Sequence, residues 1–380
     1  GPVFLRFLYL MEEEMGFELP PYPYDLLDPY KVLANQHSGG VVDLSVGTPC
    51  DPPLEDAVRA LVKSDSERGY PSSIGSEKFR TSCQEWVKRQ FDVDIDIEKN
   101  IAACIGTKEF VVSTPNYLHL RNPEKDTVLY PEISYPSYAM GAHLAGCRAV
   151  PVKVDKNGKL LLEDLDSNDI DRSLMLWVNY PSNPTGAVAD LTSIADWGRS
   201  HNVPIFSDEC YSQFVWGRKP STVLSSGLSG VVAVHSLSKR SNLAGIRAGF
   251  YAGDEDLVFW LKEIRKHSGK MMPGPVQAAA SVAYSDDHHV EKQKLRYRER
   301  LEFLQSCLKS LDIESELPQG SFYLWVWSGQ DGSWELVERL ASEVGILVAP
   351  GSFFGSSSHI RIAAVQTLEK LELIQNRLDS

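Results

Sequence analysis

The chain has 380 residues, of which 43% are hydrophobic and 23% charged, a composition typical of a folded protein of roughly two to three domains. The net charge of −13 argues against a nucleic-acid-binding protein, because such proteins gather lysine and arginine into basic stripes. The six cysteines are scattered, with no Cys-x-x-Cys pair, so we expect free thiols in a reducing cytoplasm and no metal site.

The N-terminal stretch has no features of an export or membrane segment. Its apolar run ends at Glu12 and is too short to cross a bilayer, and no basic leader or cleavage site accompanies it. The opening Gly1-Pro2 is typical of a cleaved tag and Met11 is a plausible biological start, so residues 1–10 do not enter the prediction of the fold. Residues 18–36 are rich in proline and aromatic residues and predict an irregular arm that leads into a short helix.

The central part of the chain alternates short apolar runs with segments of helical spacing. The runs are continuous rather than alternating, as expected for strands that are covered on both faces. This pattern predicts an α/β domain with a mostly parallel, seven-stranded sheet, whose ligand lies beyond the carboxyl ends of the strands. The predicted strands are 101–106, 127–131, 148–154, 174–179, 203–209, 231–236 and 248–253, with helices such as 137–146 and 191–202 between them.

The C-terminal part predicts a smaller α+β unit. A long charged helix over 288–311 is followed by strands near 321–327, 345–350 and 359–365, a helix near 333–344 and a last helix. No linker of unusual composition marks the boundary between the units. We expect an arm and part of the small domain in 1–45, the large domain in 46–265 and the small domain in 266–380.

Several polar residues follow the predicted strands, and each also has an ordinary structural explanation. Asn183 lies in "NPTG", which is typical of a turn, and Asp208 at a strand end is often a helix cap. Lys239 ends the strand 231–236 and is followed by Arg247, which together with nearby serines would suit a phosphate. The Gly-Thr pair at 106–107 precedes a helix, and it suits either a phosphate or a plain cap.

In combination these residues match one ligand, pyridoxal 5′-phosphate. A lysine can form a Schiff base with its aldehyde, and an acid such as Asp208 can hold its pyridine nitrogen protonated. Asn183 and Tyr211 can bond its phenolic oxygen, while Arg247 and the neighbouring serines can hold its phosphate. The ring of this cofactor acts as an electron sink.

Four ordered motifs resemble the signature of class I/II aminotransferases with the aspartate-aminotransferase fold. They are "NYPSNPTG" (179–186), "SDECYSQF" (207–214), "SLSKRSNLAGIRAGF" (236–250) and "HIRIA" (359–363), and the resemblance runs from about residue 20 to 365. It implies that Lys239 is the Schiff-base lysine and proton shuttle and that Asp208 pairs with the pyridinium. The remaining cofactor contacts that it implies come from Thr107, Lys108, Tyr135, Asn183, Tyr211, Ser236, Ser238 and Arg247.

The same resemblance implies the substrate contacts and the assembly. Arg361 would bind the substrate α-carboxylate, with Asn183 and the backbone near Gly47 assisting. Tyr70, in "GYPSSIG" (69–75), would reach the phosphate bound to a neighbouring subunit, which implies a homodimer with shared active sites. Small amino acids and 2-oxo acids are the partners expected, and neither a nucleic acid nor a membrane is.

A closer resemblance is to the N-succinyldiaminopimelate aminotransferases, carried by segments such as "VVDLSVGTPCDPP" (41–53) and "RKHSGKMMPGPVQAA" (265–279). It implies glutamate as donor and N-succinyl-2-amino-6-oxopimelate as acceptor, in lysine and diaminopimelate biosynthesis. A distal carboxylate needs a second cation, for which Lys108, Arg265, Lys266 and Lys270 are candidates; they would otherwise be solvated helix charges. The chain departs from many members of the family at Gln213 and Ile246.

Three alternatives stay open at this point. One is another class I/II aminotransferase, of the aspartate, alanine or aromatic type. A second is a carbon–sulfur lyase or decarboxylase on the same fold, which would share Lys239 and Asp208. The third is a cofactor-sensing regulator, which is disfavoured because nothing before residue 20 resembles a helix-turn-helix.

Overall fold

The computed structural model describes residues 17–18 and 20–380, so the predictions for residues 1–10 and Met11 lie outside it. Its largest sheet has seven strands in the order β2-β8-β7-β6-β5-β3-β4. Only β8 runs antiparallel to its neighbours, so the predicted mostly parallel sheet is confirmed. The strands are β2 (Ile101–Cys104), β3 (Thr127–Pro131), β4 (Arg148–Val152), β5 (Ser173–Asn179), β6 (Ile205–Asp208), β7 (Val231–Ser236) and β8 (Gly249–Gly253).

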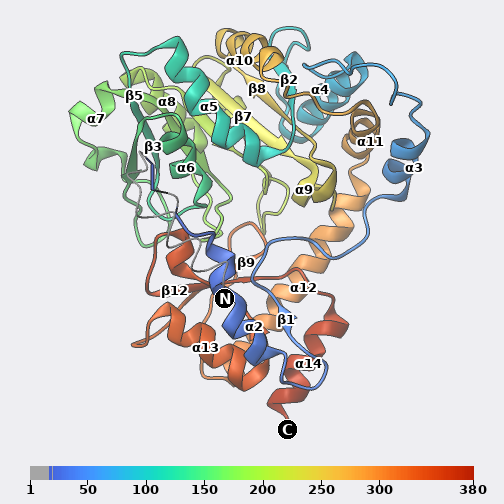
Figure 1. Ribbon diagram of the computed structural model, residues 1–380, viewed down its shortest axis with the longest axis vertical. Helices are drawn as coiled ribbons and strands as arrows, with labels where there is room; N and C mark the ends of the chain where they lie inside the picture. Colours follow the sequence, from blue (N-terminus) through green and yellow to red (C-terminus); the bar gives the residue numbers. More distant parts are fainter. Residues whose placement is uncertain (1–16, 19) are drawn as a thin grey trace.

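Helices cover both faces of this sheet, which explains the continuous apolar runs (Figure 1). Alternate residues of β5 point to opposite faces: Trp177 packs in the core under α5, α6 and α10, and Val178 packs in the core under α4, α8 and α11. The helices of the first face are α5 (Thr107–Arg121), α6 (Ser137–Leu144) and α10 (Glu255–His267). Those of the second are α3 (Glu55–Lys63), α4 (Glu77–Phe91), α8 (Leu191–His201) and α11 (Gly274–Tyr284).

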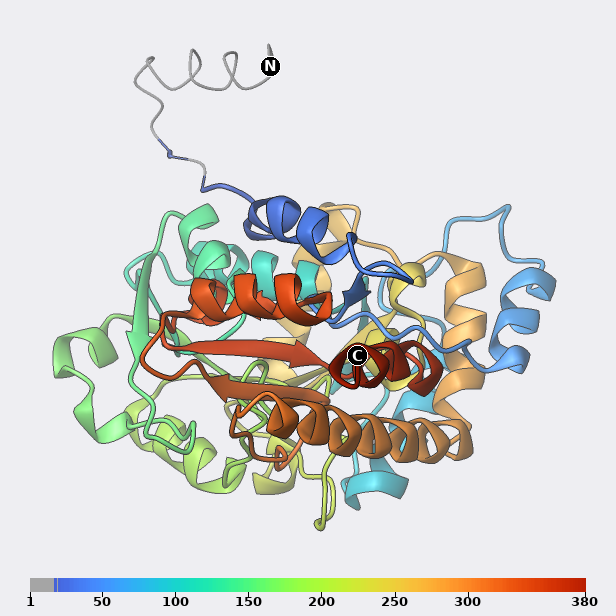
Figure 2. The same cartoon turned by 90° about the horizontal axis from the view of Figure 1, so that it is seen from below.

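A smaller unit has its own sheet and its own core. The antiparallel sheet β11-β12-β9 lies between α13 on one side and α12 on the other (Figure 2). Leu27, Val42 and Leu44 join this core from the N-terminal end of the described chain. Its elements are β9 (Tyr323–Trp327), β11 (Ala349–Pro350), β12 (His359–Ala363), α12 (His288–Ser310), α13 (Ser333–Val344) and α14 (Leu368–Leu378), with β1 (Val42–Asp43) paired to β10 (Ile346–Leu347).

The short helices are distributed over both units. The domain boundaries predicted at residues 45 and 265 stay predictions; α11 packs against α3 and α4, and the second core draws on residues from Val290 onward. Within the described residues, no helix has both the length and the apolar character needed to cross a membrane. The remaining helices are η1 (Pro23–Leu27), α2 (Asp28–Ala34), η2 (Leu162–Asp164), α7 (Ser167–Asp171), η3 (Val223–Ser226), α9 (Leu237–Arg240), η4 (Ala244–Ile246) and η5 (Gly351–Phe354).

The arrangement of the strands places three polar strand ends together. The parallel strands β5, β6 and β7 end at Asn179, Asp208 and Ser236, and neighbouring parallel strands end at the same sheet edge. The smaller unit brings β9 and β12 to this edge, because Tyr323 and Arg361 line the same cavity as these three residues. The cavity therefore lies where the large sheet meets the smaller unit.

Candidate active site

One cavity of about 330 Å³ collects nearly all of the residues that the sequence singles out. Its walls come from the ends of β5, β6 and β7, the start of α5, and the strands β9 and β12 of the smaller unit. Tyr70 and three of the four candidate cations for a distal carboxylate, Arg265, Lys266 and Lys270, do not line this cavity. The predicted residues found here are Gly47, Thr107, Lys108, Tyr135, Asn183, Asp208, Tyr211, Ser236, Ser238, Lys239, Arg247 and Arg361.

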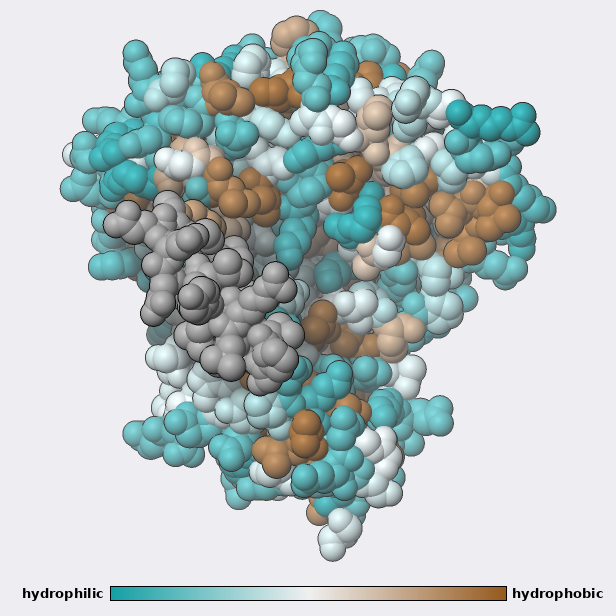
Figure 3. Space-filling view, viewed as in Figure 1, coloured by the Kyte–Doolittle hydropathy of each residue, from teal (hydrophilic) through white to brown (hydrophobic). Residues whose placement is uncertain are grey.

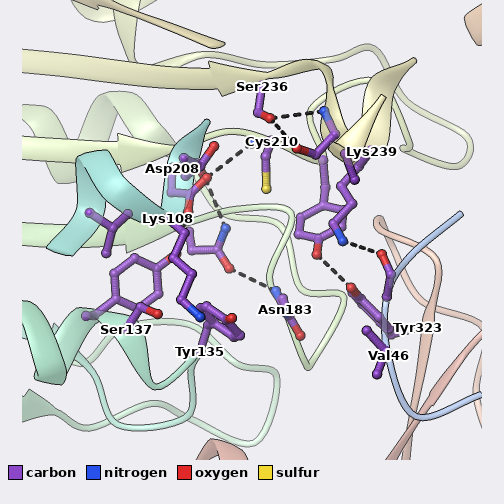
Figure 4. Close-up of a pocket in the computed structure, with 18 of the residues that line it drawn as sticks. Val46, Lys108, Tyr135, Ser137, Asn183, Asp208, Cys210, Ser236, Lys239 and Tyr323 are labelled. Atoms are coloured by element: carbon purple, nitrogen blue, oxygen red, sulfur yellow. Dashed lines mark hydrogen bonds between the residues drawn. The ribbon is translucent and has the colours of Figure 1, made fainter. Parts of the chain in front are cut away.

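Lys239 lies on the short helix α9, directly after β7, with its amine turned toward Gly47 (Figure 4). The amine donates a hydrogen bond to the Gly47 carbonyl oxygen. Loss of water around the amine lowers the pKa of Lys239 to about 8. The amine is therefore neutral in a much larger fraction of molecules than a solvated lysine, and a neutral amine is the nucleophilic form.

Asp208 is a buried carboxylate at the end of β6, with 5% of its surface exposed. It accepts a hydrogen bond of 2.7 Å from the Tyr138 hydroxyl and a longer one, 3.3 Å, from the Cys210 backbone N–H. Burial raises the pKa of Asp208 above its usual value. A buried acid with so few polar contacts is suited to a cationic partner, such as a protonated ring nitrogen.

A second group of residues forms an anion cradle between β7, α5 and Arg247. Ser236 accepts a hydrogen bond from the Ser238 backbone N–H at 3.0 Å, and the two hydroxyls lie 2.9 Å apart. The buried Thr107 hydroxyl has no hydrogen-bond partner among the described residues. A side chain at Gly106 would overlap the Arg247 guanidinium, so glycine leaves this group free to face the cradle. These donors and this cation fit a phosphate group.

Arg361, on β12, is a fully charged side chain with only 1% of its surface exposed. It donates to the Asn183 side chain at 2.8 Å and to the Ser45 carbonyl oxygen at 2.7 Å, while its buried Nε has no partner among the described residues. The rings of Tyr323 and Phe354 lie 4.3 and 4.5 Å from the guanidinium carbon. A buried cation with a free donor is suited to a carboxylate ligand.

Sequence reasoning missed several residues of this cavity. Tyr138 bonds Asp208, Tyr323 bonds Tyr211 at 2.7 Å, and the Asn179 side chain links the Asp208 carbonyl to the Asn183 backbone N–H. Tyr138 lies in the same motif as Tyr135, "PEISYPSY" (131–138), three residues further on and just inside α6, so its nearness to Tyr135 was available as a signal. Tyr323 carried no such signal, because its strand is an ordinary apolar run.

The four candidate cations for a distal carboxylate differ in their surroundings. Arg265 is 3% exposed and paired with Glu109, and Lys270 bonds Ser113 near the same carboxylate. Lys266 pairs with Glu263 at 2.8 Å on the surface. Lys108 lines the cavity, with its Nζ 5.8 Å from the centre of the Tyr135 ring. Among these four, Lys108 is therefore the cation that faces the cavity.

Comparison with known proteins identifies the family. Residues 39–378 match the model of aminotransferase class I and II. A 4-dedimethylamino-4-oxo-anhydrotetracycline transaminase from Streptomyces rimosus is 37% identical over 95% of this chain and 99% of its own length. An LL-diaminopimelate aminotransferase from Aquifex aeolicus is 35% identical over 93% of this chain and 94% of its own length.

A solved structure agrees with this match. The probable N-succinyldiaminopimelate aminotransferase from Thermus thermophilus has a TM-score of 0.85 and 28% identity, covering 94% of this chain and all of that one. The large sheet and the smaller unit therefore follow the same architecture as that solved structure. The chain belongs to the class I and II aminotransferases, whose cofactor is pyridoxal 5′-phosphate.

Proposed function

We propose that this aminotransferase moves an amino group from glutamate to N-succinyl-2-amino-6-oxopimelate, as in lysine and diaminopimelate biosynthesis. The observation that carries the amino-acid part of this proposal is Arg361, a buried guanidinium in the same cavity as Lys239 and Asp208. Among the described residues its Nε has no hydrogen-bond partner, and its guanidinium lies over the Tyr323 ring. Such a group suits the α-carboxylate that glutamate and 2-oxo acids share.

The side chains divide the work between holding, orienting and proton transfer. The bound cofactor supplies an electron sink for the bond that breaks at the substrate Cα. Lys239 would take the proton from the substrate Cα as a general base and deliver it, as an acid, to the cofactor carbon that bears the transferred nitrogen, and its pKa of about 8 permits both roles near neutral pH. Asp208 keeps the ring nitrogen protonated, and Arg361 holds the carboxylate so that the Cα bond faces the ring.

The other predicted residues hold the cofactor in this scheme. Asn183 and Tyr211 bond the oxygen on its ring, and Tyr135 stacks on the ring. The cradle of Thr107, Ser236, Ser238 and Arg247 binds its phosphate, and its unpartnered Thr107 hydroxyl supports this role. Lys108, at the cavity wall, is proposed to contact the distal part of the substrate rather than the phosphate alone.

Two relatives support the acceptor. One is named an LL-diaminopimelate aminotransferase and the other a probable N-succinyldiaminopimelate aminotransferase, and both named substrates carry a carboxylate far from the reacting carbon. Lys108 offers a cation for such a group. The Streptomyces transaminase favours a second candidate, a ring ketone, because its identity to this chain is 37%.

The experiment that tests the proposal is a panel of half-reactions, followed by the visible absorbance of the bound cofactor. Glutamate should convert the holoenzyme to its amine form, and N-succinyl-2-amino-6-oxopimelate should restore the original spectrum faster than LL-diaminopimelate-derived, aspartate-derived or alanine-derived acceptors. The panel includes 4-dedimethylamino-4-oxo-anhydrotetracycline as the second candidate. A sulfur-bearing amino acid such as cystathionine is added to test the lyase alternative. Release of pyruvate from it, or of carbon dioxide from glutamate, without formation of the amine form would instead show a lyase or decarboxylase.

We also propose that the enzyme works as a homodimer with shared sites. Tyr70 is 97% exposed and lies outside its own cavity, so a role at the phosphate requires a second copy of the chain. Apolar surface also gathers over α3, where Val62 is 78% exposed (Figure 3). A second subunit covering α3 and the loop that holds Tyr70 would bury both features.

A further inference from the structure

Two buried hydroxyls meet at the wall of the cavity. The hydroxyl oxygens of Tyr211 and Tyr323 lie 2.7 Å apart, and the two rings pack edge to face with their centres 5.5 Å apart. The exposed fractions of the two side chains are 3% and 1%. Burial raises the pKa of both phenols, so both hydroxyls keep their protons at neutral pH and one donates to the other.

Tyr323 also contacts the residue proposed to bind substrate. The centre of its ring lies 4.3 Å from the guanidinium carbon of Arg361, with Phe354 stacked on the guanidinium as well at 4.5 Å. Its hydroxyl fills the space beside Gly47, where an added Cβ would overlap it. One side chain of β9 therefore contacts both the proposed cofactor-binding phenol of Tyr211 and the proposed carboxylate-binding guanidinium of Arg361.

We infer that Tyr323 is a positioning residue that acts through Tyr211 on the cofactor ring and through Arg361 on the substrate carboxylate. The inference rests on the proposed role of Tyr211 as a hydrogen-bond donor to the ring oxygen. The pair fits a proton on either oxygen, and when Tyr211 donates to the ring oxygen, Tyr323 is the donor within the pair. A hydroxyl that accepts a hydrogen bond donates more strongly to its next partner, so in that arrangement Tyr323 strengthens the bond that Tyr211 makes. The titratable and charged groups that face this pair are Lys239, Arg361, Cys210 and Tyr24.

The test is a pH titration of the visible absorbance of the holoenzyme without substrate, comparing the native chain with Tyr323→Phe. The substitution keeps the ring against Arg361 and removes only the hydroxyl. Because a weaker Tyr211 donor stabilises negative charge on the ring oxygen less, the absorbance transition should move to higher pH by roughly half a unit. The affinity for succinate, a carboxylate that cannot react, should change less than about twofold, because the cation–π contact remains.

Two further variants separate this role from a general loss of packing. Tyr297→Phe removes a buried hydroxyl of the same core outside the cavity and should leave the transition in place. Gly47→Ala displaces the Tyr323 hydroxyl without changing Tyr323 and should produce the same upward shift. If Tyr323→Phe does not fold, Gly47→Ala still tests whether the position of the Tyr323 hydroxyl sets the pH of the absorbance transition.

The outcomes also separate this inference from the proposed function. The role of Tyr323 is overturned if the pH of the absorbance transition is the same in Tyr323→Phe as in the native chain. It is also overturned if Tyr297→Phe shifts this pH by the same amount as Tyr323→Phe. Tyr211→Phe should shift the transition by itself, and adding Tyr323→Phe to it should shift the transition no further. If Tyr211→Phe causes no shift, the proposed role of Tyr211 fails instead.

Discussion

At the scale of single residues, the cavity is built from charged groups held away from water. Lys239, Asp208 and Arg361 are each more stable in water than in a dry interior, so each needs a partner of opposite charge or a shift in its pKa. The pKa of Lys239 falls to about 8, that of Asp208 rises, and Arg361 is stacked between two rings. Under the proposed function, the bound cofactor and substrate are the partners of opposite charge for these groups.

The lowered pKa of Lys239 predicts how the apo chain captures its cofactor. Only the neutral amine attacks an aldehyde, so the capture rate should rise about tenfold per pH unit below pH 8 and level off above it. Stopped-flow absorbance after mixing the apo chain with pyridoxal 5′-phosphate measures this rate. Free N-acetyl-lysine is the control, and it should continue to rise beyond pH 9. A rate that kept rising to pH 10 in the protein would contradict the shifted pKa.

The same shift has a consequence for the stability of the apo chain. The folded chain releases the Lys239 proton near pH 8, whereas the unfolded chain keeps it to about pH 10.5. Between these values the unfolded state binds more protons, so the contribution of Lys239 to the free energy of unfolding rises with pH. The rise should be absent in Lys239→Met, as urea titrations of both apo chains would show.

Lys108 predicts a specificity change rather than a loss of chemistry. Lys108→Met should raise the KM for an acceptor with a distal carboxylate roughly threefold to fivefold, the loss expected for an exposed ion pair, and leave the KM for pyruvate unchanged. Steady-state kinetics with both acceptors measure the two effects. Lys266→Met is the matched control because that lysine pairs with Glu263 on the surface. Equal effects on both acceptors would assign Lys108 to the cofactor instead.

At the scale of elements, the loop between β2 and α5 shapes the phosphate cradle. Gly106 has a φ of +85°, and a Cβ there would overlap the Arg247 guanidinium. The Glu109 carboxylate accepts a hydrogen bond from the Ile105 backbone N–H at 2.9 Å and pairs with the buried Arg265, which fixes the start of α5. Local backbone freedom and one buried ion pair thus place the N–H groups of the helix beside the cradle.

Gly106→Ala should therefore weaken the binding of the cofactor through its phosphate. We expect the dissociation constant of pyridoxal 5′-phosphate to rise by about tenfold or more, the usual loss for a charge-assisted contact, with little change for pyridoxal. Fluorescence titration of the apo chain with both compounds measures the difference. Gly146→Ala is the control, since Gly146 has a φ of +68° and nothing within 4 Å of the added Cβ. Equal losses for both compounds would indicate strain alone.

The sequence predicted the strands of the large sheet more completely than it predicted the contacts of single residues. Each predicted strand of the large sheet lies within a few residues of an observed one, because strands covered on both faces leave a continuous apolar run. The sequence pattern does not report that β8 runs antiparallel to β7, since antiparallel and parallel strands in a buried sheet have the same composition. The contacts of Tyr138 and Tyr323 were missed for a related reason, as an apolar pattern does not show which aromatic hydroxyl faces a cavity.

At the scale of the whole molecule, a shared site predicts complementation between two defective chains. Lys239→Ala and Tyr70→Ala should each be inactive or weakened as pure proteins. In a mixed dimer, one site would combine Lys239 of the Tyr70→Ala subunit with Tyr70 of the Lys239→Ala subunit, so activity should return after subunit exchange. Assays before and after exchange measure this recovery, together with sedimentation to establish the oligomer.

A mixture that stays as inactive as its separate components would contradict a site shared between subunits. Mixing Lys239→Ala with Asp208→Ala is the control, because both of these residues line the same cavity in one chain. A mixed dimer of those two variants has a defect in each site and should recover no activity. The comparison therefore separates exchange itself from true sharing.

The sequence by itself determined the family and the seven-stranded sheet, because buried strands and ordered motifs leave local patterns. The residue types of the site are a prediction from the same motifs. The tertiary structure decided the environment of each group. It showed that Lys108, of the four candidate cations for a distal carboxylate, faces the cavity and that Arg265 is paired with Glu109. It also showed that Tyr323 connects Tyr211 with Arg361. Burial and hydrogen bonding depend on contacts between residues far apart in the chain, and local sequence patterns do not report those contacts.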